Sequence, residues 1–593
     1  MEKENKVAEP IQIDDVNVLV SGQGGDGSLT VTNMLGSLLR ARGMGVYTER
    51  DVLSRIKGGK AAASLRGSLN ERFVVRDRLQ LAVIMDEEGL HGVANRLGGD
   101  SVLLYDSSDA PIPEGLISDD VRVLVAPFGR LAVRRLGRIL YKNSISTGVV
   151  ARVLSIPDEE VRTEFRARFK RLGGAIIDQN LKALDLGFEI AEGMELSSDT
   201  GVFRVDKGDI GERLLMTGNE AIGMGFVVGG GRFFAGYPIT PATDVLEFLQ
   251  RHLPTFGGVA WQGEDELASV NMAIGASLTG VRSGTGSSGP GIALMQEGIG
   301  QAGSGEVPLV VVDTQRAGPS TGMPTKPEQS DLNMVCFGGN GDFERIVLVP
   351  GDPEDCFWLT VDACNLAQKY QMPVFVVTDQ AISQNTASVP RFDLDQVKID
   401  VGKRLSEEDL KSLEKYQRYA ITEDGVSPYS VPGTPGGQSL VTGNERDEFG
   451  NVTTLPGIRQ KMADKRKLKL ETAKDDLPKP REYGDESAEI GIVVVNAGWG
   501  AGMDAVDELK KLGVASRLHH PRTLWPLTDE TRSFIDEKKR VYVIDHSSSA
   551  QLSGVLMHAG ISSQKLHSIM RYDGTPLRPV DLAEEIYRRE TEK

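Results

Sequence analysis

The sequence is poor in cysteine, and the few cysteines that it has are not grouped. Only three occur in 593 residues, at Cys336, Cys356 and Cys364. None has the close spacing of a zinc ribbon or an iron–sulfur motif. We therefore expect no metal site in this chain and packing roles for the three thiols. So few cysteines are typical of a protein from a reducing cytoplasm.

Long apolar runs and an excess of positive charge are also missing. No run of about 18 or more apolar residues occurs, which predicts that no segment spans a membrane. The first residues, "MEKENK", lack the apolar core of a signal peptide. The formal net charge of −17 disfavours nucleic acid as a partner. With 40% hydrophobic and 25% charged residues, the composition is that of an ordinary globular protein, and its length predicts three or four domains.

Strand and helix signals alternate along the chain, which predicts an α/β fold. The strand "NVLVSG" is followed by the glycine-rich loop "GQGGDG" and then by a helix. Further strands are expected at "LAVIM", "SVLLYD" and "RVLVAP", before a helical segment that ends near residue 193. These signals indicate a first domain over residues 1–195.

Two more α/β regions follow, separated by a segment of different composition. Residues 205–402 contain "PLVVVD" and "MPVFVVTD", which are continuously apolar, as parallel strands buried on both faces should be. Residues 486–593 begin with the strand "IGIVVVNAGWG" and a helix that should end at Gly513. Residues 403–485 are rich in proline, glycine and charge, and we predict a long connection with a short helix inside it. The predicted fold class is α/β with three α/β domains.

Two glycine- and proline-rich stretches lie where ligands often bind. "FAGYPITPATDVLEFL", residues 234–249, places Thr240 between two prolines that fix the backbone φ angle. It is either a plain strand-to-helix turn or a loop that faces a substrate. "SGTGSSGPGIALMQEG", residues 283–298, forms a tight turn into a helix, whose backbone N–H groups can hold an anion or a cofactor ring, although such turns also occur without ligands.

Two charged residues stand out beside these loops. In "EDELASVNMAIGAS", Glu266 begins a helix of small residues. One interpretation is that this carboxylate does no more than interact favourably with the helix dipole. In "VVVDTQRAGPSTGMPT", Arg316 follows a buried strand, at the end of the sheet where ligands usually bind. A guanidinium grips a carboxylate through two hydrogen bonds. The alternative is a solvated or salt-bridged surface arginine.

Taken together and in this order, "GYPITPAT", "EDELASVNMAIGAS", "SSGPG" and "QRAGPSTGMPT" resemble the alpha subunit of 2-oxoacid:ferredoxin oxidoreductases, in the form fused to a gamma domain. "DGVSPYSVPG" and "TGNERDEFGN" resemble two further landmarks, but Arg446 stands where that family usually has histidine. The resemblance implies a gamma-type domain over residues 1–195, the pyrimidine-binding domain of a thiamine diphosphate enzyme over 205–402, and a transketolase C-terminal-like domain over 486–593.

The resemblance also implies roles for individual residues. Glu266 would hold the aminopyrimidine ring of thiamine diphosphate, and Thr240 would face the 2-oxoacid, which makes both catalytic. Arg316 would bind the substrate carboxylate together with Thr240. Glu264 is the competing carboxylate, and the spacing to Gly275 favours Glu266. The cofactor contacts implied are Tyr237, Pro238, Glu266, Ser288 and Gly289.

Parts of a complete enzyme are missing from the sequence. We find no Gly-Asp-Gly motif with a following asparagine for a magnesium-bound diphosphate, and no cysteine set for a [4Fe–4S] cluster. The resemblance assigns Mg²⁺ and the cluster to a separate beta subunit, which would share the thiamine diphosphate. It further implies CoA as a substrate, ferredoxin as electron acceptor, a dimer of heterodimers, and an inactive isolated chain.

Two sequence features of the first domain point to different ligands, a dinucleotide and CoA. "GQGGDG" fits Gly-x-Gly-x-x-Gly, and Glu49 follows about twenty residues later, as in a dinucleotide fingerprint. The basic stretch "ERDVLSRIKGGKAAASLRGS" offers Arg50, Lys57 and Lys60, and further Arg55 and Arg66, to the phosphates of CoA, unless it is a solvated, salt-bridged face.

The function that the resemblance implies is CoA-dependent oxidative decarboxylation of 2-oxoglutarate to succinyl-CoA and CO2, with electrons passed to ferredoxin. We favour 2-oxoglutarate because, in the family that the chain resembles, the gamma–alpha fusion is common among the enzymes that act on 2-oxoglutarate. Pyruvate or a branched-chain 2-oxoacid remains an alternative. So does a nicotinamide-dependent dehydrogenase that uses the N-terminal loop, or a non-catalytic assembly subunit.

Overall fold

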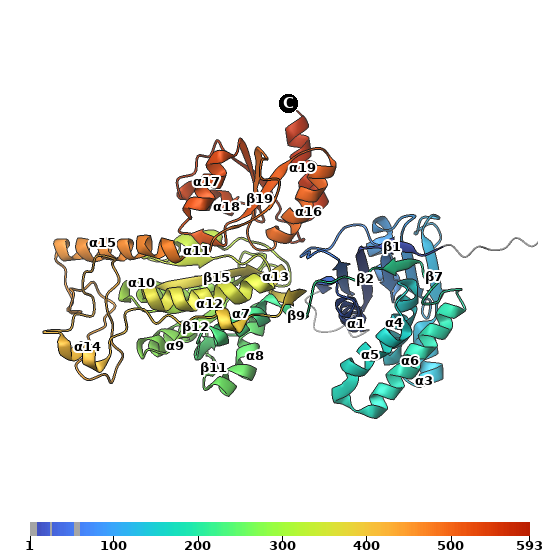
Figure 1. Cartoon of the computed structure of the whole chain (residues 1–593), viewed down its shortest axis with the longest axis horizontal. Helices are drawn as coiled ribbons and strands as arrows, with labels where there is room; N and C mark the ends of the chain where they lie inside the picture. Colours follow the sequence, from blue (N-terminus) through green and yellow to red (C-terminus); the bar gives the residue numbers. More distant parts are fainter. Residues whose placement is uncertain (1–8, 24–26, 53–59, 593) are drawn as a thin grey trace, which may run out of the picture. The chain divides into compact units, whose positions relative to one another are not determined.

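The computed structural model describes residues 9–23, 27–52 and 60–592 of the chain. They form two compact units (Figure 1). One comprises the residues up to Leu215 together with Asn385–Arg391, and the other comprises Met216–Gln384 and the residues from Phe392 onward. Large sheets of eight, seven and five strands alternate with helices along the chain, so the predicted α/β class is confirmed.

The N-terminal unit is built on the eight-stranded sheet. Its strand order is β7-β6-β5-β2-β4-β3-β16-β9, in which β2, β5, β6 and β7 run parallel while β4 is antiparallel to both β2 and β3. Strands are present at each of the apolar runs predicted for this part. The bounds are β2 Asp15–Gln23, β3 Gly45–Val52, β4 Lys60–Ser68, β5 Leu81–Ile84, β6 Val102–Asp106, β7 Arg122–Ala126 and β9 Arg213–Thr217.

One strand of this sheet comes from far along the chain. β16 (Thr386–Pro390) pairs with β3 in antiparallel fashion, with Ala387 opposite Tyr47. The N–H of Val46 donates to Ser388 Oγ over 2.8 Å, although the two residues are 342 positions apart. In the sequence these residues lie within the range predicted for the following domain, 205–402. The sheet of the N-terminal unit is therefore completed by a strand that local sequence signals did not assign to it.

Helices cover the sheet of this unit, and one of them is central. Every residue of α4 (Lys142–Val153) is buried, and it packs closely against α6 (Gly174–Glu192). The surrounding helices include α1 (Ser28–Ala41), α3 (Phe128–Leu136) and α5 (Asp158–Phe169). The helical segment predicted near residues 143–193 is thus present as three separate helices.

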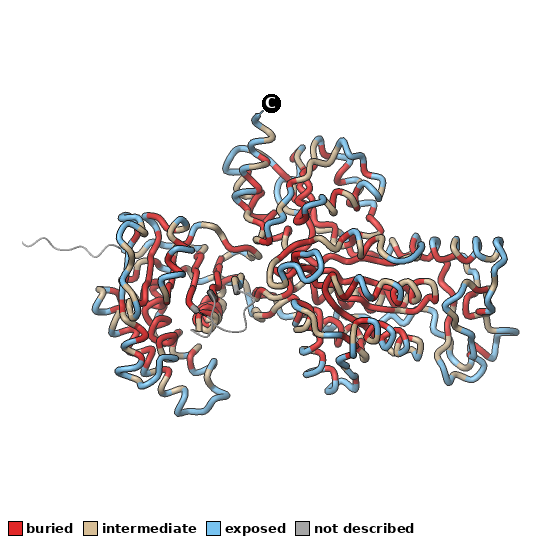
Figure 2. Tube along the Cα trace, turned by 180° about the vertical axis from the view of Figure 1, so that it is seen from behind, coloured by how far each residue is buried: buried red, intermediate tan, exposed pale blue. Residues whose placement is uncertain are grey.

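The second unit contains the seven-stranded sheet, in the order β11-β10-β12-β13-β15-β14-β20. All of these strands are parallel except β20, which joins β14 in antiparallel fashion. β13 and β15 are buried along their whole length, as their continuous apolar sequences predicted, and Figure 2 shows the buried strands in red. The bounds are β10 Phe233–Gly236, β11 Val259–Gln262, β12 Ser283–Ser287, β13 Leu309–Gln315, β14 Ile346–Leu348, β15 Pro373–Asp379 and β20 Thr523–Trp525.

The C-terminal part of the second unit is a five-stranded sheet in the order β17-β19-β18-β21-β22. Ion pairs join it to the seven-stranded part, with Arg481 Nη1 2.7 Å from Asp352 Oδ2 and Arg522 Nη2 2.7 Å from Asp355 Oδ1. Gly513 follows α16 (Gly498–Lys511) with a positive φ of 81°, which fits the predicted helix end. The strands are β17 Arg481–Gly484, β18 Ile490–Val493, β19 Ser516–His520, β21 Arg540–Asp545 and β22 Leu566–Met570.

The segment predicted as a long connection contains more helix than expected. Besides α14 (Glu407–Ser412), it forms α15 (Pro456–Ala473), a helix of 18 residues rather than a short one. The buried face of α15 includes Lys465, Arg466 and Lys469. Because these side chains are charged, the helix carries little of the apolar periodicity by which a packed helix is recognised in a sequence.

Arg446, which stands where the family that the sequence resembles usually has histidine, is a buried structural residue of this segment. It is only 1% exposed. Its guanidinium donates to the Asn444 carbonyl oxygen, to Tyr419 Oη at 3.3 Å and to Ser304 Oγ at 3.1 Å. Arg446 thereby fastens the connecting segment to the end of α10 (Gly289–Gly305).

Among the residues that the structure describes, none of the helices combines the length and the apolar character needed to cross a lipid bilayer.

Candidate active site

Three neighbouring strands of the seven-stranded sheet end at the same edge. β10, β12 and β13 are adjacent and parallel, so the segments that follow them lie side by side. These segments are residues 237–242 after β10, the start of α10 after β12, and Arg316 after β13. The predicted site residues after the three strands are thus brought to the edge of an open parallel sheet where ligands usually bind.

Arg316 reaches from the loop after β13 to the loop after β10. Its Nη1 donates a hydrogen bond to the carbonyl oxygen of Thr240 at 2.6 Å. Arg316 is only 6% exposed, and this burial lowers the pKa of its guanidinium, an effect that the nearby Asp331 opposes. Thr240 itself is exposed, and Asn219 steadies the loop by donating to the carbonyl oxygen of Pro241. Arg316 is therefore a buried cation beside an exposed hydroxyl.

Glu266 lies buried against the start of α10. It is the first residue of α9 (Glu266–Leu278), whose N-cap Asp265 accepts a hydrogen bond from the N–H of Ala268 at 2.7 Å. A side chain on Gly291 would overlap Ser287 Oγ and place its Cβ 2.7 Å from Glu266 Oε1. Glycine at position 291 is therefore what allows the carboxyl group of Glu266 to approach α10. Glu264, the competing carboxylate, is exposed to solvent.

Two serines between β12 and α10 have hydroxyl groups without partners among the described residues, and that of Ser287 borders the same space at Gly291 as the Glu266 carboxyl group. Ser287 and Ser288 are 0% exposed, and neither Oγ has a hydrogen-bond partner within the described ranges. Ser288 is one of the predicted cofactor contacts. Of the others, Tyr237 is 41% exposed and Pro238 is partly exposed. The edge of the sheet thus offers hydroxyl groups that no described residue satisfies, and an aromatic side chain, Tyr237, that faces solvent.

Two buried aspartates, which the sequence analysis did not single out, lie behind the start of α10. Burial raises the pKa of Asp313 well above its usual value, and the charge of Asp331 adds to that effect. Burial also raises the pKa of Asp331 to about 7, although Arg316 acts in the opposite direction. A Cβ on Gly289 would lie 2.6 Å from Asp331 Oδ1, so the carboxyl group touches the helix start. In the sequence, Asp313 directly follows the apolar run at residues 309–312, and no local signal shows that its carboxyl group is buried.

The candidate contacts in the N-terminal unit are less well defined. Arg50 is exposed on β3, whereas Lys57, Arg55 and the side chain of Lys60 lie outside the described residues. Arg66 does not face solvent, because it is 1% exposed and paired with Asp15, with 2.6 Å between Nη2 and Oδ2. Its candidacy for binding phosphates is therefore wrong.

The dinucleotide fingerprint does not have the expected strand arrangement. Such a fingerprint needs its glycines and its acidic residue on adjacent parallel strands. Here β4 lies between β2, which carries Gly22, and β3, which carries Glu49. Gly24 lies outside the described residues. Glu49 is therefore not on the strand next to the glycine loop.

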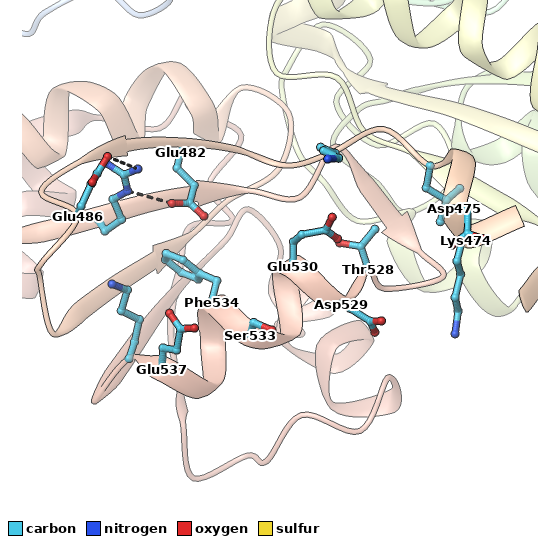
Figure 3. A pocket seen from close by; sticks show the side chains of 14 residues that line it. Lys474, Asp475, Glu482, Glu486, Thr528, Asp529, Glu530, Ser533, Phe534 and Glu537 are labelled. Atoms are coloured by element: carbon cyan, nitrogen blue, oxygen red, sulfur yellow. Dashed lines mark hydrogen bonds and ion pairs between the residues drawn. The ribbon is translucent and has the colours of Figure 1, made fainter.

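A pocket of about 720 Å³ in the C-terminal part contains none of the predicted site residues. Its lining includes Glu482, Glu486 and Arg517, and Figure 3 shows both glutamates paired with that arginine. Arg517 Nε lies 3.0 Å from Glu482 Oε2, and His519 Nδ1 lies 3.1 Å from Glu482 Oε1. Both of these glutamates thus already have partners within the fold, Arg517 for each and His519 in addition for Glu482.

Two parts of the chain match known protein families. Residues 225–463 match the family described as "Pyruvate flavodoxin/ferredoxin oxidoreductase, thiamine diP-bdg", and residues 17–190 match "Pyruvate ferredoxin/flavodoxin oxidoreductase". The 2-oxoacid:ferredoxin oxidoreductase subunit alpha of Saccharolobus solfataricus is 36% identical over 394 residues, which are 63% of this chain and 61% of that protein. Subunit alpha of 2-oxoacid:ferredoxin oxidoreductase 1 from Aeropyrum pernix is 30% identical over 632 residues, with 96% of this chain and 97% of that protein covered.

A solved structure is similar over nearly the whole chain. It is the 2-oxoglutarate:ferredoxin oxidoreductase from Magnetococcus marinus with 2-oxoglutarate, coenzyme A and succinyl-CoA bound. The TM-score is 0.91 at 32% identity, and the match covers 97% of this chain and 99% of that chain. The chain therefore belongs to the alpha-subunit family of 2-oxoacid:ferredoxin oxidoreductases, and it is an oxidoreductase subunit.

Proposed function

We propose that this chain is the gamma–alpha fused subunit of an enzyme that oxidatively decarboxylates 2-oxoglutarate to succinyl-CoA and CO2 and passes the electrons to ferredoxin. The observation that carries the proposal is the convergence of Glu266, Arg316 and Thr240 at one sheet edge. The similar solved structure from Magnetococcus marinus has 2-oxoglutarate and CoA bound, which favours this substrate pair.

The residues at the sheet edge fit half of a thiamine diphosphate site. Glu266 would hold the aminopyrimidine ring, because its buried carboxyl group can share a proton with a ring nitrogen. Gly291 leaves room for that carboxyl group, and the hydroxyls of Ser287 and Ser288, which have no partner among the described residues, are available to polar edges of the ring. When bound, the cofactor supplies the carbon nucleophile that attacks the keto group.

Arg316 and Thr240 would orient the substrate. The buried guanidinium attracts a carboxylate strongly, because few water molecules screen its charge. Its hydrogen bond to the Thr240 backbone fixes the distance between the carboxylate site and the threonine hydroxyl. That hydroxyl can then donate to an oxygen on which negative charge develops.

A beta subunit would complete the site. In this chain Thr240 and Tyr237 face solvent, and so do apolar side chains of β11 and α9: Trp261 is 55% exposed, Leu267 45% and Met272 40%. Exposed apolar groups beside an incomplete pocket suit coverage by a partner. The beta subunit would supply the Mg²⁺-bound diphosphate half and the [4Fe–4S] cluster, and the gamma-type domain would contact CoA.

The test is an activity screen of the chain assembled with its beta subunit. 2-Oxoglutarate, pyruvate and branched-chain 2-oxoacids are each supplied with CoA and a low-potential dye, and the acyl-CoA product is identified by mass spectrometry. We expect the highest kcat/KM with 2-oxoglutarate, and succinyl-CoA as the product. A preference for another 2-oxoacid would correct the substrate. Decarboxylation by the isolated chain would contradict the shared site, and nicotinamide reduction would favour a dehydrogenase.

A further inference from the structure

A second pocket lies at the amino ends of the strands of the seven-stranded sheet. Its volume is about 480 Å³, within the range of small-molecule sites. The ends of α9 and α10, the start of β13 and a loop over residues 429–441 line it. Glu266 begins α9, whereas Ser277 and Leu278 at the other end of that helix line the pocket. At about 1.5 Å per residue, the 13 residues of α9 separate the pocket from the candidate active site by about 20 Å.

Two charged residues stand out in its lining: Glu306 and Arg418. The carboxylate of Glu306 is already fully used, because Lys465 Nζ lies 2.7 Å from one oxygen and Lys469 Nζ lies 3.1 Å from the other. Burial opposes its ionisation, but Lys469, Lys465 and Arg418 together hold the pKa of Glu306 well below its usual value. Glu306 is therefore ionised, and it neutralises only part of the surrounding positive charge.

Arg418 has no carboxylate of its own in the described part of the chain. It is 7% exposed, and its Nη2 donates to the carbonyl oxygen of Glu306 at 2.8 Å. Its Nη1 finds no acceptor among the described residues. Around the ring of buried Tyr419 lie Arg418, Arg446 and Lys465, at 4.9, 5.0 and 5.8 Å from the centroid. Among the described residues, the buried cations around Tyr419 thus outnumber the buried carboxylates there, of which Glu306 is the one present.

Such an excess of buried charge is costly unless it is balanced. Each buried ion without a counter-charge destabilises the folded state, because it has lost its hydration and gained no partner. Backbone carbonyl oxygens accept hydrogen bonds from Arg418 and Lys469, but they carry only partial charge. An anion in the adjacent pocket would supply the missing negative charge. Neutral polar side chains of its lining, including Thr434, Gln438 and Ser439, could hydrogen-bond such a ligand.

We propose that this pocket binds a small organic anion through carboxylate or phosphate oxygens, attracted by Arg418 and the two lysines beneath it. The site is separate from the carboxylate grip at Arg316 and lies at the opposite ends of the same strands. It does not depend on the proposed function. The ligand binds where α9 and α10 end, so it contacts both helices that carry the candidate active site at their other ends.

The experiment measures binding to the purified full chain by isothermal titration calorimetry at constant ionic strength. The probes are malonate, inorganic phosphate and AMP, which distinguish a carboxylate ligand from a phosphate one. We expect saturable binding of at least one probe, with Kd raised at least tenfold by Arg418→Gln. Arg316→Gln should leave that Kd unchanged, which separates this site from the substrate site. Lys411→Gln, an exposed cation of α14, is the matched control.

A second variant keeps the test decisive if Arg418→Gln does not fold. Ser439 is exposed at the rim of the pocket, so Ser439→Trp should fill the space without changing any charge. We expect it to weaken binding of the same probe by a similar factor. The proposal is overturned if no probe binds saturably at millimolar concentration. It is also overturned if binding survives Ser439→Trp.

Discussion

Arg316 donates a hydrogen bond from Nη1 to the backbone oxygen of Thr240, 2.6 Å away, and so ties the loop after β13 to the loop after β10. We expect Arg316→Lys to raise KM for the 2-oxoacid at least tenfold, with a smaller effect on kcat. Lysine carries a point charge on a flexible stem and cannot hold both the loop and a carboxylate in one plane. Steady-state kinetics of the assembled enzyme measure this. Arg391→Lys, at an exposed ion pair with Glu212, should leave KM unchanged; an equal KM for both variants would contradict the role of Arg316.

The carboxyl group of Glu266 is expected to be essential for turnover. Glu266→Gln keeps the size of the side chain but removes proton exchange with a ring nitrogen, so kcat should fall at least about 100-fold. Glu264→Gln changes an exposed carboxylate two residues earlier and should keep normal turnover. Near-normal activity of Glu266→Gln, with an unchanged melting temperature, would remove Glu266 from the mechanism.

Gly291 should tolerate no side chain without loss of activity. An added Cβ overlaps Ser287 Oγ and crowds Glu266 Oε1, so Gly291→Ala should displace that carboxyl group and lower kcat at least tenfold. Gly457→Ala, in the first turn of α15, adds a Cβ that meets nothing within 4 Å and should leave kcat unchanged. If the two variants turn over equally fast, the position of Glu266 against α10 does not matter for catalysis.

The ion pairs of Glu306 should hold α15 on the rest of the second unit. Glu306→Gln leaves Lys465 and Lys469 buried without a carboxylate, and breaking such a pair costs about 3–5 kcal/mol. We expect faster hydrogen exchange of the α15 amides and a lower melting temperature. Glu407→Gln removes an exposed i,i+4 pair with Lys411 and should cost about 0.3–0.5 kcal/mol. Unchanged exchange in α15 after Glu306→Gln would show that α15 is held by other contacts.

Asp331 should make the chain lose stability as the pH rises from mildly acidic to neutral. Its pKa is about 7 in the folded chain, above the value of about 3.9 in an unfolded one. The unfolded state therefore loses its proton first, so the contribution of Asp331 is fully present below pH 4 and is lost as the pH rises toward 7. Asp331→Asn should gain melting temperature relative to the wild type between pH 5 and pH 8. A melting-temperature difference between Asp331→Asn and the wild type that stays constant from pH 5 to pH 8 would contradict the raised pKa.

Much of the sheet could be predicted, because the signals are local: β13 and β15 are visible in the sequence as apolar runs. The loops that carry Thr240 and Arg316 come after predicted strands, whereas the ligand roles of both residues rest on the family resemblance and stay predictions. The buried face of α15 carries Lys465 and Lys469, which pair with Glu306 more than 150 residues away. Apolar periodicity cannot reveal a helix that packs through charge. The burial of Asp313 could not be predicted either, because only the folded sheet shows that its carboxyl group is enclosed.

The position of β16 has a consequence for any attempt to separate the two units. A polypeptide that stopped near residue 195 would include β3 but neither β16 nor β9, and the N–H groups and carbonyl oxygens along that side of β3 would have no neighbour. Open strands of this kind recruit strands from other molecules. The amino-terminal unit is thus made of two separate stretches of the chain. A shortened protein that ends near residue 195 should self-associate. A version that also carries residues 385–391 on a linker should stay monomeric.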